Sequence, residues 1–425
     1  MNTLHTKNNL AWTEIFKKYK IKEAIESDGI YKISSSQINK FRESRLMAKF
    51  DHKNNLPQIF KTNRVSILPI SRSQYALGKF DTYYEIDPME PARKNVTIPE
   101  NLETLDIDNI YSESSAMHVA HISGMINDIL EEECWHTVSG RMSTGDFDFQ
   151  IGDLGGKSRH KIKVSGSQCE IDAGFESKNF FMIVEAKNYS VDNFLIRQLY
   201  YPYRLWERKL SKRIIPAFFT FSDNIFSFYV FRFEDLNDYN SIALQRKYEY
   251  TIGTLPLTMG DLIDVLNSTN IAEDTSVPFP QADKFERVMD LIGILNNNPL
   301  KKNDITETYQ FDSRQTDYYV NATNYLGFSE SKPDGYIELT DLGNKILSSN
   351  HKTKHILVTR SILKHGIFNS VIRDYLNTSN APSLEEIKTK MELFEETKGL
   401  GNQTMSRRAQ TIRSWVLWII KDIVI

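Results

Sequence analysis

The sequence predicts an α/β protein that is divided into more than one domain. Its 425 residues exceed what a single hydrophobic core usually organises. Apolar residues make up 40% and charged residues 25%, as in ordinary globular proteins. Segments with apolar residues at helical spacing alternate with short apolar runs that are typical of strands. We expect an α+β N-terminal region over residues 1–105, an α/β core over residues 106–270 and a mainly helical C-terminal region over residues 283–425.

The charge balance and the cysteines restrict the class of protein. The formal net charge is -3, so any binding to nucleic acid must come from local basic patches. Cys134 and Cys169 are too few for a disulfide framework or a four-cysteine zinc site, which favours a reducing compartment. The N-terminus has no apolar signal core, and Lys421 and Asp422 interrupt the apolar stretch near the C-terminus. We therefore expect a cytoplasmic protein that does not span a membrane.

The N-terminal region begins with helical patterns and continues as strands. The helical patterns are "AWTEIFKKY" and "KIKEAIES", and after Gly29 a serine-rich turn predicts a third helix. The next stretch, "VSILPISRSQYALGKFDTYYEI", is typical of strands, with breaks at Pro69 and Gly78. Prolines and asparagines in "DPMEPARKNVTIPENLE" then predict a loop that leads into the core.

The core alternates helices with strands. The stretch "SAMHVAHISGMINDILEEE" predicts a helix, and it is followed by three strand candidates, "DFDFQIG", "CEIDAG" and "FFMIVEAK". The next stretch, "VDNFLIRQLYYPYRLWERKL", predicts a helix with Asp192 as its N-cap and a kink or break near Pro202. Two apolar strands, "IIPAFFTF" and "IFSFYVFRF", then form a hairpin around the turn "SDN".

The C-terminal region follows a polar linker, "NIAEDTSVPFPQAD". Three helices are predicted over "FERVMDLIGILNNN", "KKNDITETYQ" and "SRQTDYYVNATNYLG", and a short strand or wing over "GYIELTDLGNKIL". This order resembles a winged helix, which implies that the third helix docks in the major groove with Arg314 and Gln315 near base edges. Winged helices also bind proteins, so a protein-interaction module is the alternative interpretation.

Acidic residues and a lysine are set into the apolar strands of the core. Successive side chains of a strand alternate faces, so Glu185 and Lys187 project on the same side. If the strand that carries Asp172 is adjacent, two carboxylates converge on one lysine and repel each other unless a cation is bound. Mg2+ accepts oxygen ligands of this kind and bridges to substrate phosphates. Glu170 shares a face with Asp172 and is the alternative first acid.

This set of side chains fits phosphodiester hydrolysis. In that hypothesis Asp172 and Glu185 hold Mg2+, which activates a water molecule and polarises the phosphate. Lys187 then orients or deprotonates the nucleophile. The alternative is a solvated strand face, because Glu and Lys are common on surfaces. The apolar run "FFMIV" directly before Glu185 argues against an exposed edge.

The same residues resemble the PD-(D/E)xK nucleases. Ile171 and Asp172 stand where that family has its "PD", and Glu185, Ala186 and Lys187 stand as its "ExK". The resemblance implies a restriction-endonuclease-like core, a mixed sheet flanked by helices in the order α-β-β-β-α-β. Ile171 departs from the proline of the pattern. More loosely, "SSSQINKFRESRLMAKFDHKNNLP" is similar to segments of bacterial type II restriction endonucleases, which implies DNA recognition or clamping by the N-terminal region.

The resemblance also implies supporting residues on the flanking helices. Gln198 matches the position of a glutamine that holds the active-site lysine or a water in some relatives. Arg197 and Arg204 would neutralise phosphates, although an amphipathic helix with solvated basic residues explains them equally well. One of Glu131 to Glu133 could serve as an extra metal ligand, with a charged helix end as the alternative.

The resemblance implies a type II restriction endonuclease, which cleaves double-stranded DNA at a specific sequence with Mg2+ and leaves 5'-phosphate ends. A palindromic target would require a homodimer, and a separate DNA methyltransferase would protect the host. No G-x-x-x-x-G-K-[ST] motif occurs, so an ATP-driven machine would need a partner chain. Two alternatives stay open: a non-catalytic winged-helix DNA-binding regulator, and a structure-specific repair nuclease of the same fold.

Overall fold

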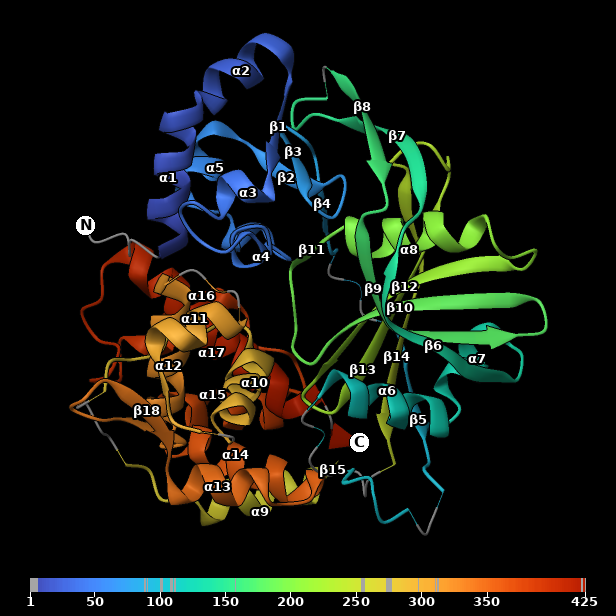
Figure 1. Ribbon diagram of the computed structural model, residues 1–425. Helices are drawn as coiled ribbons and strands as arrows, with labels where there is room; N and C mark the ends of the chain where they lie inside the picture. Colours follow the sequence, from blue (N-terminus) through green and yellow to red (C-terminus); the bar gives the residue numbers. More distant parts are fainter. Residues whose placement is uncertain are drawn as a thin grey trace. The chain divides into compact units, whose positions relative to one another are not determined.

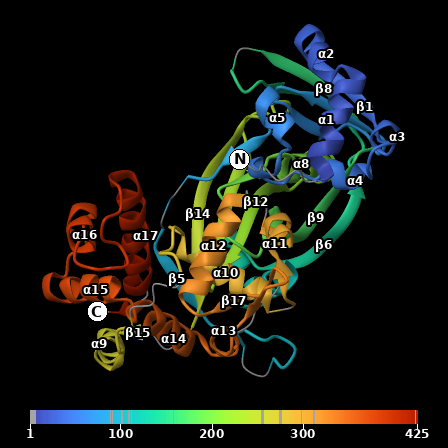
Figure 2. The ribbon, with the colours of Figure 1, turned by 90° about the vertical axis from the view of Figure 1, so that its left-hand side faces the viewer.

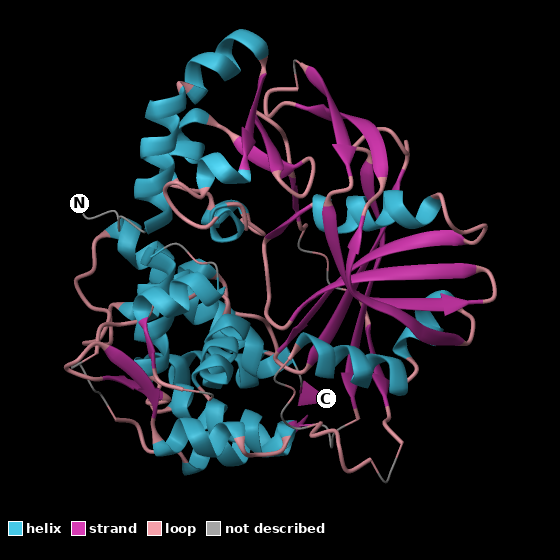
Figure 3. Ribbon diagram, viewed as in Figure 1, coloured by secondary structure: helices cyan, strands magenta, loops and turns pink. Residues whose placement is uncertain are grey.

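The computed structural model describes residues 7–424 except 88, 90, 100, 101, 108, 109, 111, 157, 254–256, 273–276, 297, 310, 312 and 422. The chain divides into two compact units. The first comprises Met1–Pro99, Ser112–Phe221 and Ile225–Thr251, and the second Glu100–Tyr111, Ser222–Asn224 and Ile252–Ile425. Strands gather in the first unit and helices predominate in the second (Figure 3). Among the described residues, no helix is both long and apolar enough to cross a membrane.

The N-terminal part of the first unit has its own hydrophobic core of helices on a small sheet. Trp12 and Phe60 are fully buried at its centre, with ring centroids 4.8 Å apart. The helices are α1 (Lys7–Tyr19), α2 (Ile21–Asp28), α3 (Ser35–Ile38), α4 (Ser44–Met47), the 3-10 helix η1 (Lys53–Asn55) and α5 (Gln58–Asn63). The strands, in the sheet order β1-β3-β2, are β1 (Ile30–Ser34), β3 (Gln74–Gly78) and β2 (Ser66–Pro69).

The serine-rich segment forms less helix than the sequence predicted. It begins as strand β1, and α3 is a single turn whose start is stabilised by a capping box. The Ser34 hydroxyl accepts a hydrogen bond from the Gln37 backbone N–H at 3.2 Å, and the Gln37 side chain accepts one from the Ser34 N–H at 2.9 Å. The predicted strands around Pro69 and Gly78 are present as β2 and β3.

A large mixed sheet forms the centre of the first unit, so the predicted α/β class is correct. Strand β10 pairs in parallel with β12 and antiparallel with β9. The loop predicted before the core is partly wrong, because β5 pairs with β14 at one edge of the sheet. The strand order is β5 (Arg93–Val96), β14 (Ile242–Ile252), β13 (Ile225–Phe233), β12 (Arg213–Ser222), β10 (Phe180–Lys187), β9 (Gln168–Ser177) and β6 (Cys134–Ser143).

Helices cover both sides of this sheet. The predicted single helix before the strands is two helices, α6 (Glu113–Ile122) and α7 (Met125–Leu130), because the chain turns at Gly124 with φ 80°. Helix α8 (Arg197–Glu207) connects β10 to β12. Figure 1 shows α8 on one side of the sheet and α6 and α7 on the other.

The start of α8 differs from the prediction. Asp192 does not cap the helix, because the next three residues form strand β11 (Asn193–Leu195), which pairs with β4 (Tyr83–Glu85). The helix also continues through Pro202. The pairing of β11 with β4 ties the segment after β10 to the N-terminal part of the same unit.

A hairpin and helix α8 share one aromatic core with the N-terminal sheet. The hairpin consists of β7 (Asp146–Gly152) and β8 (Arg159–Ser165). Phe149 of β7 packs on Tyr200 of α8 with ring centroids 5.2 Å apart, and both belong to the same buried cluster as Phe80. Figures 1 and 2 both show β8 beside the N-terminal strands.

The second unit is mainly helical, with a small three-stranded sheet in the order β16-β18-β17. The predicted wing is partly correct: β18 is a strand, but the stretch after it forms a helix. The helices are α9 (Met259–Ser268), α10 (Phe285–Leu295), α11 (Lys302–Tyr309), α12 (Ser313–Tyr325), α13 (Asp341–Leu347), α14 (His351–Leu363), α15 (Gly366–Thr378), α16 (Leu384–Met391) and α17 (Asn402–Lys421). The strands are β15 (Leu257–Thr258), β16 (Leu300–Lys301), β17 (Ser329–Ser331), β18 (Tyr336–Leu339) and β19 (Ile423–Val424).

Gly78 provides a test of the packing between the N-terminal sheet and the aromatic core. A Cβ atom on Gly78 would overlap the Phe80 ring and lie 3.0 Å from the Gly29 carbonyl oxygen. We expect Gly78→Ala to lower the free energy of unfolding by roughly 1–3 kcal/mol, the usual cost of overpacking. In Gly293→Ala, the control, the new Cβ meets nothing within 4 Å inside helix α10. That variant should gain roughly 0.5–1 kcal/mol. Equal destabilisation of both in thermal unfolding would contradict this account.

Candidate active site

Strand β10 ends in a buried ion pair. The side chains of Glu185 and Lys187 lie on one face of the strand, and Ala186 between them lies on the other. The two charged side chains are only 9% and 8% exposed. Lys187 Nζ donates hydrogen bonds to Glu185 Oε1 at 2.5 Å and to the Ala186 carbonyl oxygen at 2.9 Å. The sequence prediction that both side chains point to one place agrees with this geometry.

Asp172 meets this pair where strand β9 leaves β10. The register between the two strands ends at Ala173 opposite Val184. Beyond it the Ala186 N–H donates to Asp172 Oδ2 at 2.7 Å. The carboxylate therefore takes the place of a backbone acceptor, which fixes Asp172 beside the Glu185–Lys187 pair.

Gln198 also contacts Glu185. It lies in the first turn of α8, and its Nε2 donates a short hydrogen bond to Glu185 Oε1. Its own Oε1 is buried and has no hydrogen-bond partner among the described residues. Gln198 and Lys187 both donate to Glu185 Oε1. The other carboxylate oxygen, Oε2, accepts no hydrogen bond from any described residue.

Two further acids at the site were missed in the sequence. Glu113 lies half-buried in the first turn of α6, and the charges of Lys187 and Asp172 act on its carboxyl group. Asp51, 6% exposed, lies in the segment between α4 and η1. The N-cap at Ser112 predicts an acid in that first turn as an ordinary helix feature, and no local pattern distinguishes Asp51.

The electrostatics of the cluster favour a bound cation. Burial raises the pKa of Glu185 to about 8, although Lys187 opposes this shift. Burial likewise raises the pKa values of Asp172 and Glu113, and Lys187 lowers them only in part. Burial alone would lower the pKa of Lys187, but Glu185, Glu113 and Asp51 outweigh it and the pKa is raised. Burial thus disfavours the ionised form of these carboxyl groups, and a bound cation would favour it.

Asp172 and Glu185 could hold a divalent cation between them. Each has one carboxylate oxygen engaged in the hydrogen bonds above and the other without a hydrogen bond among the described residues. Among all the described residues, no group of three or more His, Cys, Asp or Glu side chains is arranged to bind a metal ion. Two carboxylates fit Mg2+, which is usually bound through one or two carboxylates with waters and substrate phosphates filling the other positions.

The other predicted residues lie in different surroundings. Glu170 pairs with Arg141 at 3.1 Å on the surface, and its charge contributes to the raised pKa of Asp172 after burial. Arg197 is half-buried, with its guanidinium over the Tyr201 ring. In the second unit, Arg314 is exposed in the first turn of α12 and Gln315 follows it half-buried.

The prediction that Arg204 contacts DNA is wrong. The side chain is 2% exposed. It donates to the Asp148 carbonyl at 3.1 Å, the Leu236 carbonyl at 2.9 Å and the Tyr200 hydroxyl at 2.8 Å. Tyr200 belongs to the aromatic core, and the two carbonyl groups lie at part-buried positions beside it. Arg204 therefore stabilises the packing of α8 and cannot reach a phosphate.

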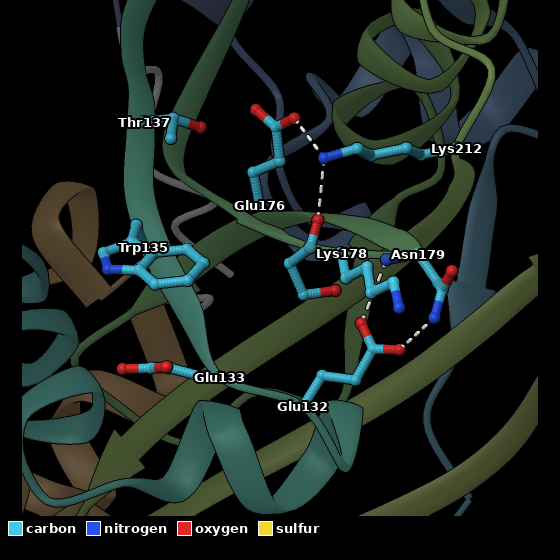
Figure 4. Close-up of a pocket in the computed structure, with 9 residues that line it drawn as sticks. Glu132, Glu133, Trp135, Thr137, Glu176, Lys178, Asn179 and Lys212 are labelled. Atoms are coloured by element: carbon cyan, nitrogen blue, oxygen red, sulfur yellow. Dashed lines mark hydrogen bonds and ion pairs between the residues drawn. The ribbon is translucent and has the colours of Figure 1, made fainter.

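An open hollow of about 770 Å3 lies at the other end of strands β9 and β10 (Figure 4). Glu132 and Glu133 line it, although one of them was considered as an extra metal ligand. Asn179 lines the hollow directly before strand β10 starts at Phe180, which is five residues along the strand from Glu185, roughly 16 Å in an extended strand. Figure 4 shows Glu132 bound to Asn179 and Lys212 bound to Glu176, so these polar groups satisfy each other. The hollow is therefore not part of the candidate site.

Comparisons with known proteins give three family models, all described as domains of unknown function. DUF6996 matches residues 9–77, DUF6997 matches residues 78–251 and DUF7226 matches residues 287–424. No curated protein and no solved structure matches the chain. The first span lies in the first compact unit, and the second span lies there except for residues 100–111 and 222–224. The candidate site draws Asp51 from the first span and its other acids from the second.

The raised pKa of Asp172 predicts how stability depends on pH without metal. In Asp172→Asn the amide oxygen can still accept from the Ala186 N–H. A carboxyl whose pKa is raised by folding costs nothing below its ordinary pKa and destabilises the fold as pH rises. We therefore expect Asp172→Asn to match the wild type at low pH and to exceed its stability near pH 8 in EDTA. A variant less stable than the wild type at pH 8 in thermal unfolding would contradict this.

Proposed function

We propose that the protein is a sequence-specific endonuclease of the type II restriction class, which hydrolyses double-stranded DNA with Mg2+ and leaves 5'-phosphate ends. The observation that carries the proposal is the buried group of Asp172 in strand β9 and of Glu185 and Lys187 at the end of the adjacent strand β10. Gln198 supports it by binding the same oxygen of Glu185 as Lys187.

The order of elements supports a restriction-endonuclease-like core of the PD-(D/E)xK type. Helices α6 and α7 precede β6, β9 and β10, and α8 then leads to β12. The three strands are antiparallel neighbours, and β12 is parallel to β10. This is the α-β-β-β-α-β order that the sequence resemblance implies, with the β7–β8 hairpin inserted after the first strand.

The residues of the site have separate roles in this proposal. Mg2+, held by the free oxygens of Asp172 and Glu185, would polarise the phosphate and lower the pKa of a bound water. The raised pKa of Lys187 keeps it as an ammonium, so its role is to donate a hydrogen bond to a phosphoryl oxygen and stabilise developing negative charge. Gln198 holds Glu185 in one orientation, and the Ala186 N–H does the same for Asp172.

The second unit supplies the proposed DNA reading. Its elements run α10, β16, α11, α12, β17 and β18, the order of a winged helix. Arg314 and Gln315 at the start of α12 would meet base edges in the major groove. A homodimer on a palindromic site, a separate cognate methyltransferase and a cytoplasmic location belong to the same proposal.

The same winged-helix order favours a second candidate, a DNA-binding regulator without catalysis. Digestion of mixed-sequence DNA with Mg2+, followed by sequencing of the ends, separates the candidates. Ends that share one short sequence support restriction, and cutting only at branched or damaged DNA indicates a repair nuclease. Tight binding with no cutting of any DNA favours the regulator.

Substitutions in the cluster test the chemistry. We expect Lys187→Ala and Glu185→Ala to lower the cleavage rate at least about 100-fold, because each removes stabilisation of the transition state. Lys178→Ala, the control, alters an exposed lysine at the far turn between β9 and β10 and should cleave normally. Thermal unfolding and DNA binding confirm that the variants fold. Near-wild-type cleavage by either cluster variant would refute the site, and EDTA should abolish activity that added Mg2+ restores.

A further inference from the structure

The N-terminal part of the first unit is fastened to the core directly beside the candidate site. The Leu195 N–H donates to the Asp51 carbonyl at 3.0 Å, and the Lys53 N–H donates to Asn193 Oδ1 at 2.9 Å. Between them, His52 Nδ1 lies 2.6 Å from the Asn193 carbonyl oxygen. Three consecutive residues are thus fixed to the segment that follows the Glu185–Lys187 strand end.

This attachment places one acidic and one basic side chain at the site. Asp51 is 8% exposed at its side chain, and Lys49 is 73% exposed. Their charged atoms are 3.9 Å apart, too far for a hydrogen bond. The charge of Asp51 acts on Lys187 and Glu113, and the charge of Lys49 acts on Glu113. Asp51 therefore lies on the inner side and Lys49 at the solvent side of the same group of acids.

The N-terminal span is basic although the protein is not. Residues 9–77 contain 13 Lys and Arg against 6 Asp and Glu, a net charge of +7, whereas the whole chain has -3. The segment that carries Lys49 is rich in such residues: Lys40, Arg42, Arg45, Lys49 and Lys53 occur within residues 40–53. Lys40 and Arg45 are exposed and form no ion pair with any described residue. Lys49 thus connects a basic segment to a site where acidic side chains outnumber basic ones.

We propose that the segment of residues 40–53 is a DNA-backbone contact of the nuclease, with Lys49 binding a phosphate next to the scissile one and Asp51 holding Lys49 in place. The inference rests on the proposed function. The Lys49 ammonium is exposed and makes no hydrogen bond to Asp51, so a phosphate competes readily for it. The ammonium has three donors and can bind the phosphate while it stays near Asp51.

We expect this segment to bind the sugar-phosphate backbone, because it carries Lys and Arg side chains that attract phosphates. A flexible ammonium is a point charge that positions a phosphate without reading the base sequence. Lys49 should therefore contribute to affinity for every sequence. Specificity would remain with other contacts.

The experiment compares Lys49→Gln with Lys17→Gln, a control that removes the same charge from an exposed position of the same span. Binding to a mixed-sequence duplex is measured in EDTA, without cleavage, between about 50 and 200 mM KCl. We expect Lys49→Gln to weaken binding several-fold and to reduce the slope of log K against log salt by about 1, the loss of one phosphate contact. Lys17→Gln should leave the slope unchanged, and Lys49→Arg should restore it.

The outcomes separate this inference from the proposed function. Equal slopes for Lys49→Gln and the wild type would overturn the Lys49 contact even if the protein cleaves DNA. A changed slope in a protein that binds DNA but cuts none would support the contact and remove the nuclease proposal. With Mg2+, Lys49→Gln should raise KM more than it lowers kcat, whereas Lys187→Ala loses kcat with its salt slope intact. Wild-type protein that does not bind DNA at all would overturn both proposals.

Discussion

The structure of the first unit depends on the burial of Glu185 and Lys187 at the end of a central strand. Burying two charges costs several kcal/mol for each ion unless hydrogen bonds compensate. Here the Ala186 carbonyl, Gln198 and the opposing charge provide that compensation. Gln198 reaches the pair from the first turn of α8. Asp172 lies beside the pair because its carboxylate accepts the Ala186 N–H where β9 leaves β10.

The segment between β10 and α8 joins the N-terminal part to the core. The residues after Lys187 form strand β11, which pairs with β4, and this delays the start of α8 to Arg197. The helix then buries Tyr200 and Tyr201 against the β7–β8 hairpin and the N-terminal sheet in one aromatic cluster. Two spans that match separate family models therefore share a hydrophobic core, and neither buries its apolar surface fully without the other.

Local features of the structure could be predicted from the sequence, whereas contacts between distant segments could not. Alternation along "FFMIVEAK" placed Glu185 and Lys187 on one face, and the turn at "SDN" forms with positive φ at both Asp223 and Asn224, as hairpin turns require. Arg204 appeared solvent-exposed because its buried acceptors lie far away in sequence. Asp51 and Glu113 gave no signal for the same reason: only the tertiary fold brings them to Lys187.

The excess of acid at the site has a consequence for the proposed chemistry. Carboxylates that gather to bind a cation also repel the phosphates of DNA, and Mg2+ neutralises only part of that charge. Outside residues 9–77 the chain is net negative, so attraction for DNA must come from a basic surface nearby. The N-terminal span is basic and is fixed to the segment that follows strand β10. Under the proposed function, the catalytic core thus depends on its N-terminal neighbour for packing and for holding its substrate.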